Sequence, residues 1–380
     1  MGLPKALLKD KSIPRRISMF KALEYYKPGY AEVVQRFEKF YNAAEQKSPG
    51  NLVYRALLDS DLRIYENLKL NTYDFTTDKG LQIYVDDLVR ELHIVSESRR
   101  GVKDDTLPMV MPVLGAGDYS AFVAGEIVFG EDTSWSQPVL NSVDDWKSLP
   151  KLGEAIWYRR FLDICERLLD KSASSGVPFM RGFFSPLDLA HALRGNDIYL
   201  DFFDSPGQVH GLLSYCADAT IMLAEDVFQL AKKYLSDTKI GLWFLEGCIN
   251  MSEDTACMIS PELYRTFAAP HTQRVINHFG RGLLHCHSRA LYLIPELCAL
   301  HGVVNVWVAT DPNQTRPIDV LDELIPQANG VGLSLDLESR DDIVRNIEVA
   351  KGGNIAFCSP VRDREEANEI TALVRKHSVS

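Results

Sequence analysis

The stretch Gly282-Leu283-Leu284-His285-Cys286-His287-Ser288 is a short apolar run that ends in three side chains able to bind a metal. Successive residues of a strand face opposite sides, so His285 and His287 would share one face and Cys286 would point the other way. Two imidazoles at a strand end suit a metal or an acid/base pair. A similar run, Asn354–Cys358, ends in another thiol. We expect the rest of the chain to bring these two strand ends together.

Short apolar runs alternate with longer amphipathic segments from Leu107 to the C-terminus, which is typical of βαβ units and a parallel sheet. The expected strands are Leu107–Leu114, Val177–Met180, Ile240–Leu245, Gly282–His287, Val303–Val308, Val331–Leu335 and Asn354–Cys358. The expected helices are Glu154–Lys171, Gln208–Tyr234, Pro261–Phe279, Ala290–Leu300, Pro317–Ile325, Arg340–Ala350 and Arg364–His377.

The number of strands decides between two α/β architectures, a closed (β/α)8 barrel of the TIM type and a doubly wound open sheet. Seven runs are one short of the barrel, while no glycine-rich phosphate-binding motif follows the early strands to support the open sheet. We predict the barrel, with an eighth strand near Leu81–Val85 or His93–Val95. Residues 1–105, including helical patterns at 31–41 and 51–68, are predicted to form an N-terminal helical extension, and residues 106–380 the barrel.

In such barrels the chemistry lies at the carboxyl ends of the strands. Several polar residues follow the predicted strands. For some of them a position in a solvent-exposed loop is as good an explanation as a functional role. Asp118 and Tyr119, Arg181 and Asp311 are predicted to bind substrate, and Glu246 to act as a base or a ligand. The complete set at the strand ends is Gly115–Tyr119, Arg181, Glu246, His285, His287, Thr310, Asp311, Asp336 and Cys358.

Composition narrows the class of protein. The formal net charge of −11 argues against a nucleic acid or an anionic membrane as partner, since both require a basic surface. Seven irregularly spaced cysteines indicate free thiols rather than a disulfide framework. No apolar run reaches membrane-spanning length and the N-terminus has no signal-peptide core, so a cytoplasmic location is expected.

The segment Ser252–Pro270, which includes Ser260-Pro-Glu-Leu-Tyr-Arg265, resembles a stretch of the uroporphyrinogen decarboxylase superfamily. Ser185–Gly195 is similar to another stretch of it, and Leu284–Ser288 falls where its cobalamin-dependent methyltransferases carry His-x-Cys-Gly. The resemblance runs from about Leu107 to the C-terminus and implies a (β/α)8 barrel. The arginine-rich signature of the decarboxylase itself, Arg-Gln-Ala-Gly-Arg-Tyr, is not found near the N-terminus.

The methyltransferase branch holds zinc with His-x-Cys and a distant cysteine. In this chain the resemblance implies zinc bound by His285, His287 and Cys358, with His285, His287 and Glu246 in the catalysis. One thiolate instead of two leaves the centre with a formal charge of plus one, which makes it a stronger Lewis acid. A harder methyl acceptor, such as water, an alkoxide or a folate-like amine, is then favoured over the thiol of the relatives.

The leading hypothesis is a zinc-dependent methyltransferase that moves a methyl group between a corrinoid and a small acceptor such as a thiol or folate. No Asp-x-His-x-x-Gly corrinoid motif is present, so the corrinoid should belong to a partner protein. Two alternatives stay open. One is a lyase that decarboxylates a tetrapyrrole or another polycarboxylate, and the other is a non-catalytic corrinoid- or tetrapyrrole-binding protein.

Overall fold

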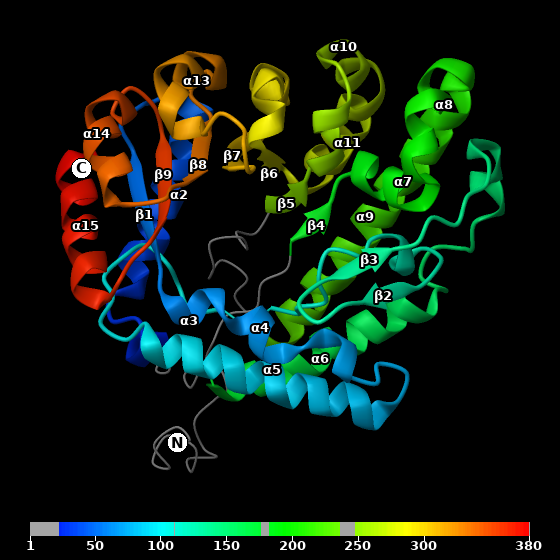
Figure 1. The fold of residues 1–380 in the computed structure, drawn as a ribbon, viewed down its shortest axis with the longest axis horizontal. Helices are drawn as coiled ribbons and strands as arrows, with labels where there is room; N and C mark the ends of the chain where they lie inside the picture. Colours follow the sequence, from blue (N-terminus) through cyan, green and yellow to red (C-terminus); the bar gives the residue numbers. More distant parts are fainter. Residues whose placement is uncertain (1–22, 110, 176–181, 236–247, 380) are drawn as a thin grey trace.

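A seven-stranded parallel sheet organises the protein. The computed structural model describes residues 23–109, 111–175, 182–235 and 248–379. The strand order is β1-β9-β8-β7-β6-β5-β4, and the strands form an arc with most helices on its outer side (Figure 1). The strands are β1 Leu52–Leu57, β4 Phe183–Phe184, β5 Cys248–Ser252, β6 Arg281–His287, β7 Val303–Ala309, β8 Gly332–Asp336 and β9 Ile355–Pro360.

The helices cover the sheet and confirm most of the predicted positions, among them Arg340–Ala350 and Arg364–His377. They are α2 Tyr30–Gln46, α3 Asp59–Leu62, α4 Ile64–Leu68, α5 Asp78–Ser98, α6 Ile156–Ser175, α7 Pro186–Arg194, α8 Ile198–Asp204, α9 Pro206–Leu235, α10 Pro261–Leu263, α11 Ala269–Phe279, α12 Ile294–Ala299, α13 Leu321–Ala328, α14 Arg340–Ala350 and α15 Arg364–His377. A π-helical turn, Tyr264–Ala268, joins α10 to α11. An antiparallel hairpin pairs β2 Ile127–Phe129 with β3 Ser134–Ser136.

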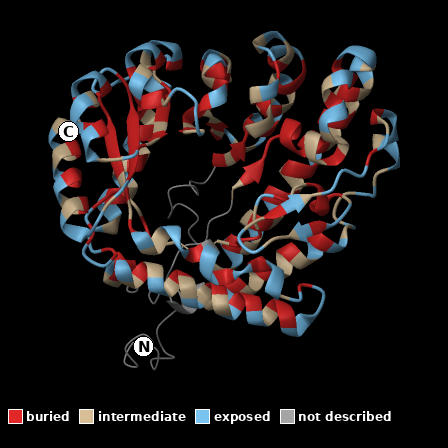
Figure 2. Ribbon diagram, viewed as in Figure 1, coloured by how far each residue is buried: buried red, intermediate tan, exposed pale blue. Residues whose placement is uncertain are grey.

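The last four predicted strands are confirmed as β6, β7, β8 and β9. Most of their residues are buried, as expected of parallel strands covered by helices, and the half-buried ones gather toward the carboxyl ends of β6, β7 and β8 (Figure 2). The predicted strand Leu107–Leu114 is wrong, because its described residues form an irregular segment. Pro108 and Pro112 explain this, since proline has no N–H to donate to a ladder. The predicted strands at 177–180 and 240–245 lie outside the described residues.

The N-terminal part also differs from the prediction. Leu52–Leu57, read as helix, is strand β1 and pairs in parallel with β9. A six-residue apolar run is compatible with either structure until its partner is known. Both positions suggested for an eighth strand, Leu81–Val85 and His93–Val95, lie in α5 instead. The boundary at residue 105 stays a prediction, although β1 belongs to the main sheet.

Side chains cap the free edge of β1 in place of another strand. Asp105 exchanges backbone and side-chain hydrogen bonds with Tyr54, and Asp104 Oδ2 accepts from the Ala56 backbone N–H at 2.9 Å. Arg99 donates to the Ala56 carbonyl and to Asp104. β1 and β4 are the outermost strands of the described sheet, and no ladder joins them there. The α/β class is therefore confirmed, while the closed barrel stays a prediction.

Among the described helices, none combines the length and the apolar character that crossing a membrane requires.

Candidate metal centre

His285 and His287 lie at the carboxyl end of β6 and share one face of the strand, as predicted. Both imidazoles are partly exposed, whereas Cys286 between them is fully buried on the opposite side. The two ring centroids are 5.0 Å apart. The alternation of a strand therefore places two imidazoles together and withdraws the thiol from the site.

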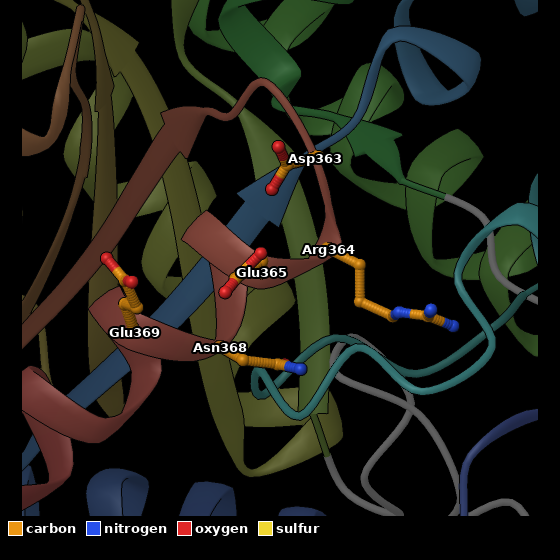
Figure 3. Close-up of a pocket in the computed structure, with 5 residues that line it drawn as sticks. All are labelled: Asp363, Arg364, Glu365, Asn368 and Glu369. Carbon is orange, nitrogen blue, oxygen red and sulfur yellow. The ribbon is translucent and has the colours of Figure 1, made fainter.

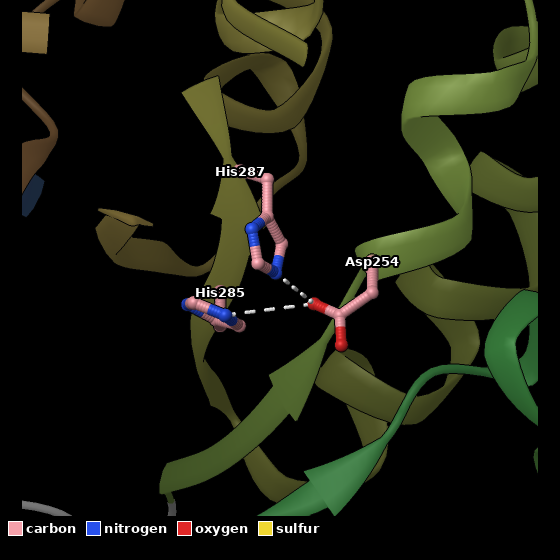
Figure 4. A group of neighbouring side chains, drawn as sticks. All are labelled: Asp254, His285 and His287. Atoms are coloured by element: carbon pink, nitrogen blue, oxygen red, sulfur yellow. Dashed lines mark ion pairs between the residues drawn. The ribbon is translucent and has the colours of Figure 1, made fainter. Parts of the chain in front are cut away.

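The third member of the cluster is Asp254, which follows β5 in the short helical turn Asp254–Met258. Its Oδ1 atom lies 3.5 Å from Nε2 of His285 and 3.5 Å from Nε2 of His287 (Figure 4). The three ligand atoms are all within 4.8 Å of one another. Among the described residues, this is the group of histidine, cysteine and acidic side chains that meets the spacing of a metal site.

The distances fit a bound divalent cation. Two ligand atoms held by one zinc ion at about 2.1 Å in tetrahedral geometry lie about 3.4 Å from each other. The two Asp254–histidine separations of 3.5 Å match that value. Oδ1 of Asp254 is buried and accepts no hydrogen bond from the described residues. A buried acceptor is normally satisfied, so this oxygen is available to a ligand other than the described residues.

The pKa values of Asp254 and His285 are compatible with a bound cation. Burial, together with the carboxylates of Asp188, Glu253 and Asp311, raises the pKa of Asp254 to about 8. Burial and the neighbouring His287 lower the pKa of His285 to about 4. Without a metal, both groups therefore favour their neutral forms at pH 7. A divalent cation reverses the balance for Asp254, because it stabilises the carboxylate and binds the neutral imidazole.

Asp311, predicted to bind substrate, contacts His287. Its Oδ1 lies 3.0 Å from Nδ1 of His287. Asp311 is itself held by the Arg289 backbone N–H and by reciprocal hydrogen bonds with Ser288. A carboxylate that accepts a hydrogen bond from the ring nitrogen facing away from the metal fixes the orientation and tautomer of a metal-binding imidazole. Nε2 of His287 is thereby left to face Asp254.

Asp188, in the first turn of α7, holds the segment that carries Asp254. Its Oδ2 accepts from the Ser252 hydroxyl at 2.6 Å and from the Asp254 N–H at 3.0 Å. Its Oδ1 accepts from the backbone N–H of Thr255 at 2.9 Å and from the Thr255 hydroxyl. Asp188 is 3% exposed. This buried carboxylate therefore fixes the backbone conformation around Asp254, the third member of the cluster.

Cys358, predicted as the third ligand, is not a member of the cluster. It lies on β9, opposite Arg55 of β1 and Asp336 of β8. Burial raises the pKa of its thiol to about 12, and strands β7 and β8 separate it from β6 in the sheet. Trp307 of β7 lies between His285 and the neighbourhood of Cys358. The centroid of its ring is 4.4 Å from that of His285, and its Nε1 donates to Asp336 at 3.0 Å.

No protein-family model matches this chain, and no curated protein matches it.

A cavity of about 430 Å³, here called the inner pocket, lies beside His285. Asp118 and Tyr119, both predicted to bind substrate, line it. Asp118 is fully buried, and the Tyr119 hydroxyl lies 3.1 Å from the Ser252 hydroxyl. The other lining residues are Arg55, Met109, Met111, Pro112, Val113, Leu114, Gly115, Gly182, Phe183, Asn250, Ser252, His285 and Trp307. The remaining predicted site residues, Arg181 and Glu246, lie outside the described residues.

A separate hollow lies at the start of α15, lined by Asp363, Arg364, Glu365, Asn368 and Glu369 (Figure 3). Arg364 and Asn368 use their polar groups to hold the loop at Arg100–Lys103. None of its lining residues belongs to the metal cluster, so we assign this hollow to the packing of α15.

Proposed function

We propose that this protein is a zinc-dependent methyltransferase that moves a methyl group between a corrinoid carrier and a small acceptor. The proposal includes a closed (β/α)8 barrel and membership of the uroporphyrinogen decarboxylase superfamily. The observation that carries it is the convergence of Asp254, His285 and His287 at adjoining strand ends beside the inner pocket. Carboxyl ends of parallel strands are where such folds bind substrates.

Zinc suits this donor set. Two imidazoles and one carboxylate are a familiar ligand set for catalytic zinc, which keeps a further position open for a substrate. When bound, the ion polarises the acceptor and lowers the pKa of an acceptor hydroxyl, thiol or water. With Asp254 in place of a thiolate, the centre keeps a formal charge of plus one. This favours a hard acceptor, such as an alkoxide, water or an amine, over a thiol.

The protein residues have distinct parts in this proposal. Asp254, His285 and His287 hold the ion, and Asp311 orients His287. Trp307, packed against His285, and Tyr119 form walls of the inner pocket that exclude water from the acceptor. In the transfer, a lone pair of the acceptor forms the new bond to carbon, and the electron pair of the carbon–cobalt bond stays with cobalt. The proton of the acceptor is released to solvent.

The seven cysteines are all free thiols, which supports the proposed cytoplasmic location. The acidic net charge agrees with a small-molecule acceptor and a protein-borne corrinoid rather than nucleic acid as partner.

The test combines metal analysis with a methyl-transfer assay. We expect about one zinc per chain, lost in His285→Ala and retained in His278→Ala, a surface histidine that pairs with Glu225. Methylcobalamin absorbance should then decay only when an acceptor is present. Less than about half an equivalent of zinc, unchanged by His285→Ala, would remove the metal from the proposal. An unreactive bound spectrum would indicate the non-catalytic binder, and carbon dioxide release from uroporphyrinogen the lyase.

A further inference from the structure

The metal cluster lies between two cavities rather than at the end of one. His285 lines the inner pocket, and Asp254 lines a second cavity of about 440 Å³, here called the outer pocket. The facing atoms of these two residues are 3.5 Å apart. Tyr119 lines both cavities. The other residues of the outer pocket are Ala116, Gly117, Ser134, Trp135, Ser136, Pro138, Asp188, His191, Ala192, Gly195, Asn196 and Thr255.

The two cavities differ in their access to the surface. The outer pocket has exposed residues on its rim, namely Ala116, Trp135, Pro138 and Asn196. Every lining residue of the inner pocket that the structure describes is buried or half-buried. A group carried by a large molecule can therefore approach the cluster from the outer side, whereas the inner side admits a small diffusing molecule.

Hydrogen bonds hold one wall of the outer pocket, the segment at Gly117, against the β2–β3 hairpin. The Gly117 N–H donates to the Ser134 hydroxyl at 2.9 Å, and the Ser136 hydroxyl donates to the Gly117 carbonyl at 2.8 Å. A side chain at Gly117 would lie 2.2 Å from the Trp135 backbone nitrogen, so this close approach requires glycine. The Trp135 indole packs over Gly130 and remains 56% exposed. An exposed indole on a fixed hairpin offers a flat surface for a ring system.

Tyr119 is held where the pockets meet. The Ser252 hydroxyl donates to Asp188, so the Tyr119 hydroxyl donates in turn to Ser252. The ring of Tyr119 also packs 4.9 Å from that of Phe184. The same Asp188 that fixes Asp254 thereby fixes the partition between the cavities.

We propose that the outer pocket receives the methyl donor, with one face of its planar macrocycle against Trp135, while the inner pocket holds the acceptor. This deepens the proposed function and rests on it. Tyr119 lies where the two pockets meet, and both substrates are bound at once beside the metal cluster. A lone pair of the acceptor forms the new bond to the methyl carbon as the carbon–cobalt bond breaks. The electron pair of the broken bond stays on cobalt, and the acceptor loses its proton.

The experiment measures binding and turnover in variants of the full chain. Trp135→Ala should weaken binding of methylcobalamin about tenfold in an absorbance titration, and should raise its KM by a similar factor. The KM of the acceptor and the zinc content should not change. Met111→Ala, in the inner pocket, should raise the KM of the acceptor only. Ile156→Ala removes a similarly exposed apolar side chain from α6 and should change neither constant.

Unchanged methylcobalamin binding in Trp135→Ala, or a rise in the acceptor KM instead, would overturn the assignment of the outer pocket. Parallel lines in double-reciprocal plots, which indicate that one product leaves before the second substrate binds, would also overturn it. If methylcobalamin binds through Trp135 but its methyl group is never transferred, the pocket assignment stands and the proposed methyltransferase function fails.

Discussion

Nδ1 of His287 lies 3.0 Å from Oδ1 of Asp311, a carboxylate 24 residues further along the chain, beyond α12 and β7. Loss of such an outer carboxylate typically weakens metal binding by about 10–100-fold. We therefore expect Asp311→Asn to raise the zinc dissociation constant by a factor in this range, measured by competition with a chromophoric chelator. Asp319→Asn, at an exposed pair with Arg316, serves as the control and should bind zinc normally. Equal affinity in both variants would contradict the role of Asp311.

Asp188 gives a second test, because it touches the segment of Asp254 and neither histidine. The amide of Asp188→Asn keeps one acceptor oxygen, so its NH2 group must face either the Asp254 N–H or the Thr255 N–H, which already donates there. We expect zinc affinity to fall by about 10–100-fold and the visible spectrum of the cobalt-substituted protein to change. Asp188→Glu should recover part of the affinity. An unaltered cobalt spectrum in Asp188→Asn would show that Asp188 does not position the ligand.

Metal binding should release a proton over a defined pH range. In the metal-free protein the pKa of Asp254 is raised to about 8 and that of His285 lowered to about 4. Between pH 6.5 and 8, Asp254 is therefore protonated while His285 is already neutral. Zinc must displace the Asp254 proton, so affinity should rise about tenfold per pH unit in this range and level off above pH 8. Calorimetry in buffers of different ionisation enthalpy counts the released proton.

The same two shifts affect folding stability in opposite directions. The raised pKa of Asp254 stabilises the metal-free protein at low pH, and this contribution is lost as pH rises toward 8. The lowered pKa of His285 contributes stability above pH 6.5 that is lost as pH falls toward 4. We expect the unfolding free energy of the metal-free protein to decrease from pH 6.5 to 8, unlike that of Asp254→Asn. Urea denaturation at several pH values measures it.

The hydrogen bonds and ion pairs that Arg99, Asp104 and Asp105 form at the edge of β1 should be important for the stability of the fold. Asp104 is fully buried between Lys27 at 2.8 Å and Arg99 at 2.6 Å. Burial alone would raise its pKa, but these two cations hold it well below the usual value. Asp104→Ala removes the carboxylate partner of buried Lys27 and leaves Arg99 with Asp61 alone, and we expect a loss of about 3–5 kcal/mol in urea unfolding. Asp59→Ala, at an exposed pair with Arg63, should cost less than about 1 kcal/mol.

The sequence pattern predicted two of the three residues of the candidate metal cluster and missed the third. His285 and His287 could be found because they alternate along an apolar run that forms a strand. Asp254 was not predicted because attention went to Glu246, after the predicted strand Ile240–Leu245, and both lie outside the described residues. The observed β5 ends at Ser252, so the acidic residues that follow it are Glu253 and Asp254. Which acidic side chain reaches the site therefore depends on where a strand ends, which periodicity alone does not fix.

β1 was missed for a related reason. Leu52–Leu57 is too short for its periodicity to separate strand from helix, and only its pairing with β9 decides the matter. The prolines at 108 and 112 were the available evidence against a strand in the predicted run Leu107–Leu114.

The pairing of β1 with β9 has a consequence for biosynthesis. Asn51 and Asn354, which flank these strands, are hydrogen-bonded across 303 residues of sequence. Strand β1 remains without this neighbour until the 303 residues that separate Asn51 from Asn354 have been translated. We expect the nascent protein to expose this strand edge over that interval and to bind chaperones that shield emerging chains.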